Sequence, residues 1–162
     1  MHLAERDRDP SSTIDDRSTE EGPALRDARS TAERVAADEA DAAEARTRLR
    51  EAAPPPIEPD ANIVGHLTAG ESLHGLRTHA ILSTPGAEHT LGYGGSLYLT
   101  SRRLVHLGQV MVSVQLSDIV ETALAGERLL LSLRDGEGMA LDLDRPRLFR
   151  AELAATMRAT RP

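Results

Sequence analysis

The sequence predicts a mainly β domain that is closed by a C-terminal helix and preceded by a helical arm. Short apolar runs recur at intervals of about ten residues between positions 72 and 144, separated by glycine and aspartate turns, which is typical of an antiparallel meander. Near the C-terminus the apolar period changes to that of a helix. Alanine, glutamate and arginine dominate residues 23–53, and all three favour helix.

Two N-terminal segments precede the domain. Residues 1–22 are polar and charged, and we expect disorder there, because they cannot bury enough surface to offset the entropy of ordering the backbone. Residues 23–53 are predicted to form a charged, alanine-rich helix that begins at Pro23, a residue suited to a first helical turn. A three-four spacing relates six of its apolar residues: Leu25, Ala28, Ala32, Val35, Ala42 and Leu49. Glu39 and Arg46 interrupt this seam, so two alternatives stay open, a solvated, isolated helix and a coiled coil with a partner.

A proline-rich linker separates this helix from the domain. The run "PPPIEP" at residues 54–59 cannot continue a helix and favours an extended spacer. We therefore place the linker at residues 54–61 and the compact domain at residues 62–162. The apolar runs expected to form strands are residues 72–83, 96–100, 103–108, 110–117, 118–126, 128–136 and 138–144.

The C-terminal segment has the pattern of an amphipathic helix. Pro146 lies near its start, where proline is tolerated, and Asp144 is in a position to cap it. Phe149, Leu153 and Met157 repeat every four residues and form one apolar face. We expect this face to cover the open mouth or corner of a curled sheet.

The composition excludes several classes of protein. Residues 1–60 hold nine arginines against sixteen acidic residues, which accounts for the whole net charge of −7, and residues 61–162 are neutral. Neither part has the basic excess of a nucleic-acid-binding protein. The 162 residues contain no cysteine, no apolar leader at the start, and no apolar run of the roughly 20 residues that a membrane span needs. We therefore expect a cytoplasmic protein with no transmembrane segment and no nucleic-acid partner.

Four stretches of the domain carry a resemblance to a known family: "LYLTSRRLVHLG", "VSVQLSDI", "LLLSLRDG" and "RPRLFRAELAATM". Through them, residues 70–161 resemble the bacterial pleckstrin-homology-like (PH-like) domains, relatives of the wider PH and GRAM superfold. In that family a strand ending in Thr-x-Arg-Arg turns into the next strand, and an Asp-Ile pair, matched here by Asp118 and Ile119, opens a later one. The resemblance implies an antiparallel barrel or sandwich of about seven strands, capped by the C-terminal helix. It also implies binding or scaffolding more than catalysis.

Three arginines are candidate contacts for a ligand or partner. Arg102 and Arg103 lie at the turn between two predicted strands. They form either a solvated hairpin tip that braces nearby acids, or a planar fork for a carboxylate or phosphate. Arg77 lies on the first strand. By the resemblance, lipid-binding members hold headgroups with lysines and arginines on the first strand, the loop after it and the second strand. The loop here, residues 83–95, has neither, so a membrane-lipid ligand is disfavoured.

No residue pattern indicates catalysis, a metal or a cofactor. The six histidines lack a ligand spacing, "GYGGS" lacks a nucleophile elbow, and no Gly-x-Gly-x-x-Gly opens a helix. We therefore expect a non-enzymatic interaction or scaffolding module that binds a protein partner, or a second copy, through a sheet edge or its arm. An edge that is blunted by charge or covered by the arm is the opposing structural alternative. The alternative function is a lipid- or small-ligand-binding domain that uses the glycine-rich loop and Arg77.

Overall fold

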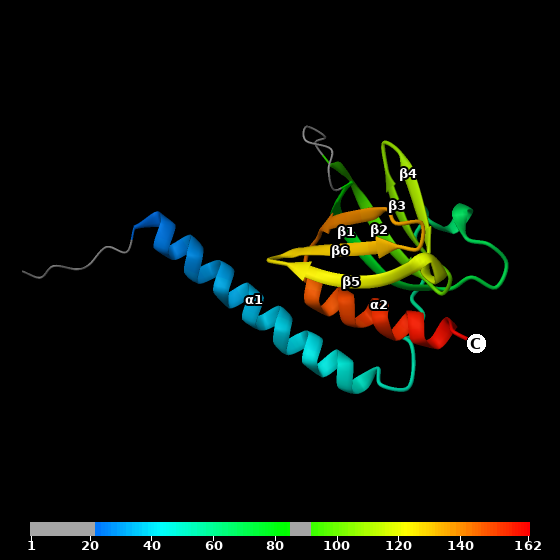
Figure 1. The fold of residues 1–162 in the computed structure, drawn as a ribbon, viewed down its shortest axis with the longest axis horizontal. Coiled ribbons are helices and arrows are strands. Elements are labelled where there is room, and N and C mark those ends of the chain that lie inside the picture. The colour runs from blue at the N-terminus through cyan, green and yellow to red at the C-terminus, as the bar shows by residue number, and fades with distance from the viewer. Residues whose placement is uncertain (1–21, 85–91) are drawn as a thin grey trace, which may run out of the picture.

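The computed structural model describes residues 22–84 and 92–162. The disorder predicted for residues 1–22 therefore lies outside the described residues except at Gly22. Figure 1 shows a curled sheet, a C-terminal helix along it, and a long N-terminal helix that extends beyond the sheet. The elements are α1 (Pro23–Arg48), a 3-10 turn (Val64–His66), β1 (Leu73–Ser83), β2 (Tyr93–Thr100), β3 (Arg103–Gly108), β4 (Met111–Gln115), a second 3-10 turn (Leu116–Asp118), β5 (Ile119–Ala125), β6 (Arg128–Leu133), β7 (Gly138–Asp142) and α2 (Pro146–Thr160).

The seven strands form one antiparallel sheet in the order β4-β3-β2-β1-β7-β6-β5. This sheet and the helix that follows it confirm the mainly β class predicted from the sequence. The 11-residue strand β1 joins the two halves, since it pairs with β2 along its length and with β7 at residues 81–83. Its register with β2 shifts between Leu73 and Gly75 and again between Arg77 and Ala80, irregularities of the kind that bend a strand. Strands β4 and β5 are the two edges of the sheet.

The main core lies between the inner face of the sheet and α2. Helix α2 contributes Phe149, Leu153 and Met157, the three residues that the sequence placed on its apolar face. The strands contribute mainly leucines: Leu82, Leu97, Leu99, Leu104, Leu129, Leu131 and Leu141. Full burial of such a side chain stabilises the fold by about 1.5–3 kcal/mol. The helix therefore covers the curled sheet, as its apolar face predicted.

A smaller cluster lies on the outer face of β1, β2 and β3. Its buried members are Ile63, Leu73, Tyr98 and Val105. The backbone amide of Ile57 donates to the carbonyl of Leu73 at 2.8 Å, and the Tyr98 hydroxyl donates to the Asp60 carboxylate at 2.9 Å. Residues 54–63, expected to begin with an extended spacer, thus lie against the sheet. They cover Tyr98, which the alternation of β2 directs away from the main core.

The C-terminal half of α1 packs against α2. The two helices run parallel, because Asp38 of α1 lies at the start of α2 and Leu49 lies near its end. The interface consists of three alanines and two leucines: Ala45, Ala151, Ala155, Leu49 and Leu148. Small side chains let two helices approach closely. The arm is therefore docked on its own domain over this half.

The buried stripe of α1 differs from the seam expected from the sequence. It consists of Asp38, Ala42, Ala45 and Leu49. Glu39 and Arg46, which interrupt the expected seam, are exposed, and Asp38 and Ala45 take their places. The buried stripe keeps an unbroken three-four spacing from Asp38 to Leu49. The apolar pattern alone does not reveal it, because Asp38 is charged.

The carboxylate in this stripe caps α2. Asp38 accepts hydrogen bonds from the backbone amides of Arg147 at 2.8 Å and Leu148 at 2.9 Å. The residue before α2 is Arg145, which has a left-handed backbone with φ of 52° and gives no side-chain cap. The prediction that Asp144 caps this helix is therefore wrong: the cap comes from α1, because the sharp turn at Arg145 leaves the first amides of α2 facing the other helix.

Candidate functional site

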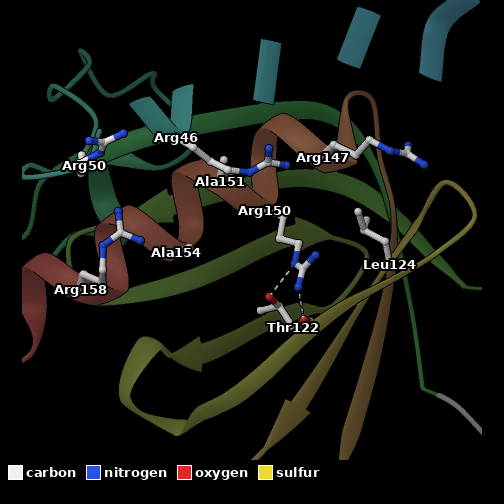
Figure 2. Close-up of a pocket in the computed structure, with 9 residues that line it drawn as sticks. All are labelled: Arg46, Arg50, Thr122, Leu124, Arg147, Arg150, Ala151, Ala154 and Arg158. Carbon is white, nitrogen blue, oxygen red and sulfur yellow. Dashed lines mark hydrogen bonds between the residues drawn. The ribbon is translucent and has the colours of Figure 1, made fainter. Parts of the chain in front are cut away.

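A cleft of about 500 Å³ lies between α1, α2 and the edge strand β5. Figure 2 shows the nine residues that line it. They are five arginines and four small or uncharged residues: Arg46, Arg50, Arg147, Arg150, Arg158, Thr122, Leu124, Ala151 and Ala154. We call this the arginine cleft. None of its lining residues is acidic, so the cleft is locally cationic on a chain whose net charge is −7.

Helix α2 carries three of the arginines on one face. Arg147, Arg150 and Arg158 fall on the same side because the helix repeats every 3.6 residues. Ala151 and Ala154 lie between them, and their short side chains leave open the space that forms the cleft. Figure 2 shows Arg158, Arg150 and Arg147 following one another along α2.

The other wall of the cleft belongs to the N-terminal arm. Arg46 lies in the last turn of α1, and Arg50 lies just beyond its end. Both reach the cleft because Ala45 and Leu49 dock on α2. The arginine cleft is therefore shared between the arm and the domain and is complete only while α1 is docked.

Carboxylates reach two of the five arginines. Arg147 has Nη1 at 3.7 Å from Asp38 and Nε at 3.5 Å from Glu39, and Arg46 has Nη2 at 3.1 Å from Glu39. The remaining three form no ion pair with any residue in the described ranges: Arg50, Arg150 and Arg158. Their charges are therefore not neutralised by a carboxylate of the described residues.

Two of these three guanidinium groups are held in place by neutral acceptors. Arg150 donates from Nε to the Thr122 hydroxyl at 3.0 Å and from Nη2 to the Thr122 carbonyl at 2.8 Å. Arg158 donates from Nη2 to the carbonyl of Leu49 at 3.0 Å. These bonds fix the positions of the cations without neutralising them, and each guanidinium keeps further N–H donors.

Two arginines of the cleft, Arg150 and Arg147, also contact one edge of the sheet. Arg150 bonds the carbonyl of Thr122 on β5, and Arg147 bonds the carbonyl of Gly126, just beyond β5, at 3.2 Å. A strand added to β5 would need such groups. At the opposite edge, β4 ("MVSVQ") carries no charge, and no side chain in the described ranges bonds its outer backbone groups. Arg150 thus occupies one backbone acceptor of the β5 edge, whereas no described side chain bonds the outer backbone of β4.

Arg103, one of the candidates from the sequence, is engaged inside the fold. It donates to both carboxylate oxygens of Glu71, at 2.9 and 3.2 Å, and to the carbonyl of His66 at 2.5 Å. The Glu71 side chain has no exposed surface. Burial raises the pKa of Glu71, but the hydrogen bonds from Arg103, Thr100 and Thr68 outweigh it and lower the pKa to about 2. Arg103 therefore ties β3 to the turn before β1.

Arg102 and Arg77 lie elsewhere on the surface. Arg102 is exposed and donates to the Thr68 hydroxyl at 3.2 Å. Arg77 pairs with Glu152 at 3.1 Å and lies over the ring of Phe149. Neither lines the arginine cleft, so the structure does not bring the three candidates together in one site. Their role as ligand contacts stays a prediction.

None of the five arginines of the cleft was expected as a site residue from the sequence. A signal was present in α2, where Arg147, Arg150 and Arg158 share a face with two alanines. No comparable signal existed for Arg46 and Arg50, because their place depends on how α1 docks.

Neither a metal-binding cluster nor a membrane-spanning helix is found in residues 22–84 and 92–162. No group of three or more histidine, cysteine, aspartate or glutamate side chains there is arranged to hold a metal ion. Neither α1 nor α2 combines the length and the apolar character that crossing a membrane requires.

Comparisons with known proteins bear on the fold alone. No protein-family model matches the chain, and a search of curated proteins gives no match. Among solved structures, the N-terminal PH domain of Vps36 is similar, with 20% identity over 58% of this chain and 82% of that one, at a TM-score of 0.47. The C-terminal domain of an unknown protein from Leishmania infantum (15% identity, 55% and 87% covered, TM-score 0.45) and the PH domain of USP37 (17%, 51% and 95%, 0.38) are also similar.

Proposed function

We propose that this chain is a non-enzymatic interaction module that binds an anionic partner in the arginine cleft. The observation that carries the proposal is the convergence of five guanidinium groups on one concave site, three of them without a carboxylate. Guanidinium groups bind carboxylates and phosphates through paired, charge-assisted hydrogen bonds. A ligand with several negative charges is therefore the one that this lining favours.

The lining supports binding more than chemistry. Apart from arginine, its one polar side chain is Thr122, whose hydroxyl already accepts a hydrogen bond from Arg150. A nucleophile needs a neighbouring base, and acid–base catalysis needs a group that titrates near neutral pH. The lining offers neither, so we assign the cleft a recognition role.

The test is equilibrium binding of fluorescein-labelled polyglutamate to the full chain, followed by anisotropy. We expect saturable binding that weakens as salt is added. The double variant Arg50→Gln/Arg158→Gln is expected to lose it, whereas Arg48→Gln/Arg134→Gln, which removes the same charge outside the cleft, is expected to keep it. Equal binding by both double variants would overturn the proposal.

The open β4 edge supports a second candidate function, self-association. An uncharged strand can pair with its own copy without placing like charges opposite one another, and Met111 on this edge is 44% exposed. Light scattering on the full chain is expected to show a dimer that Met111→Lys dissociates. The matched change Val120→Lys on β5, an exposed residue of the opposite edge strand, is expected to leave the dimer intact. A monomer at all protein concentrations would rule out this candidate.

A further inference from the structure

We infer that the arginine cleft binds an extended protein segment that carries several acidic side chains in series. This inference rests on the proposed function, anion binding in the cleft, and names the class of partner. It follows from the spacing of the fixed cations, from the composition of the lining and from the state of the neighbouring sheet edge.

The fixed cations are spread along α2. Arg150 and Arg158 lie eight residues apart on α2, about 12 Å along the helix axis. They are held apart, because Arg150 is bonded to Thr122 of β5 and Arg158 to Leu49 beside α1. Because these bonds direct the two guanidinium groups to different partners, a single phosphate or carboxylate is poorly placed to contact both. A ligand that contacts both Arg150 and Arg158 must therefore carry several negative charges spaced along its length.

An extended peptide matches this spacing. A strand rises about 3.3 Å per residue, so four residues span about 13 Å. Alternate side chains lie on the same side of a strand. Acidic residues at every second position would therefore present carboxylates along the row from Arg150 to Arg158, with Arg50 of the facing wall beside them.

The lining of the cleft separates a peptide from a nucleic acid. No tyrosine, phenylalanine or tryptophan lines the cleft, so stacking of nucleic-acid bases has no platform there. The floor consists of Ala151, Ala154 and Leu124, which suits the aliphatic part of a glutamate side chain.

The backbone carbonyls beside the cleft determine how the segment is held. The Thr122 carbonyl of β5 already accepts from Arg150, and the Gly126 carbonyl accepts from Arg147. A peptide in the cleft is therefore held through its carboxylates and not by adding a strand to β5. The spacing of its acidic side chains should therefore affect its affinity more than hydrogen bonds to its backbone do.

The test compares labelled peptides by anisotropy with the full chain. The main probe is a short peptide in which glutamate and serine alternate. Its controls replace the glutamates with glutamines or gather all glutamates at one end. Inorganic phosphate, a short single-stranded oligonucleotide and vesicles of phosphatidylcholine with phosphatidylserine serve as competitors. The alternating peptide is expected to bind best, and none of the competitors is expected to displace it.

Arg50→Gln provides a variant that does not disturb the fold, because Arg50 makes no hydrogen bond or ion pair with a described residue. Loss of one charge-assisted contact is expected to weaken peptide binding by about tenfold. Arg48→Gln, two residues away and paired with Glu44 on the exposed side of α1, is expected to bind like the unaltered chain. Circular dichroism of both variants checks that α1 and the sheet are intact.

The outcomes separate the inference from the proposed function. If phosphate, the oligonucleotide or the vesicles bind and the peptide does not, and Arg50→Gln weakens that binding, the peptide inference is overturned while anion binding stands. If the clustered and alternating peptides bind equally, the in-series geometry is overturned. If nothing binds, or Arg50→Gln and Arg48→Gln behave alike, the proposed function fails as well.

Discussion

The carboxylate of Asp38 in α1 accepts a hydrogen bond from the backbone amide of Leu148 in α2 at 2.9 Å, across 110 residues of sequence. A helix normally receives such a cap from the residue that precedes it. Here the preceding residue, Arg145, supplies none. The start of the closing helix therefore depends on the docked arm, and this dependence can be measured.

Replacing the capping carboxylate should destabilise the whole domain. We expect Asp38→Ala to lower the free energy of unfolding by about 1–2 kcal/mol, because two amides at the start of α2 lose their acceptor. Urea denaturation followed by circular dichroism measures the change. The control is Asp41→Ala, which removes an exposed ion pair with Arg145 and should change stability by less than about 0.5 kcal/mol. Equal losses of unfolding free energy in the two variants would show that the hydrogen bonds from α2 to Asp38 do not stabilise the domain.

Removing the whole arm should destabilise the domain more than removing the Asp38 carboxylate alone. A fragment that begins at Asn62 lacks Asp38, exposes Ala151 and Ala155, and loses the bond from Tyr98 to Asp60. We expect it to unfold at a lower urea concentration than the full chain, with a loss of more than about 2 kcal/mol. A fragment that begins at Pro23 keeps all these contacts and should match the full chain. If both fragments unfold together, α1 does not stabilise the domain.

Glu71 should make stability depend on pH in the acid range. Its pKa is about 2 in the folded protein against 4.5 as an ordinary glutamate. A lowered folded pKa contributes stability that is complete above pH 4.5 and is lost as the pH falls toward 2. The difference in unfolding free energy between the unaltered chain and Glu71→Gln should then be constant above about pH 5 and shrink by up to about 3 kcal/mol below it. A constant difference down to pH 2 would contradict this assignment.

The two adjacent arginines at the β2–β3 turn should differ sharply in importance. Arg103→Ala leaves the buried carboxylate of Glu71 without its cation, and we expect a loss of about 3 kcal/mol or more. Arg102→Ala removes one exposed hydrogen bond to Thr68 and should cost less than about 0.5 kcal/mol. Thermal unfolding of both variants at neutral pH gives the comparison. Similar shifts in the melting temperature would show that Arg103 is not the stabilising partner of Glu71.

The architecture could be predicted because it follows from local patterns. Alternation and turn residues locate the strands, and the four-residue repeat of Phe149, Leu153 and Met157 locates α2 with its buried face. Those signals depend on neighbouring residues and need no knowledge of the rest of the chain. The start of α1 at Pro23 follows from the same kind of signal.

The contacts that position the site depend on distant residues instead. Arg103 meets Glu71 across 32 residues, and Asp38 meets Leu148 across 110. Nothing in the residues around Asp38 distinguishes it from the exposed Glu39 until α2 is placed beside it. The arginine cleft belongs to this second kind, since Arg46 and Arg50 join it only through the docking of α1.

The unequal edges of the sheet also set a limit on assembly. Edge-to-edge addition can continue without end only when each molecule offers two free edges. Among the described residues, Arg150 and Arg147 donate hydrogen bonds to two carbonyls at the β5 side, whereas no side chain bonds the outer backbone groups of β4. Two molecules that meet through β4 bury the open strand of both and form a closed, two-fold pair. Further growth from such a pair would have to use β5, where Arg150 already bonds the Thr122 carbonyl, so we expect the pair to resist extension into fibres.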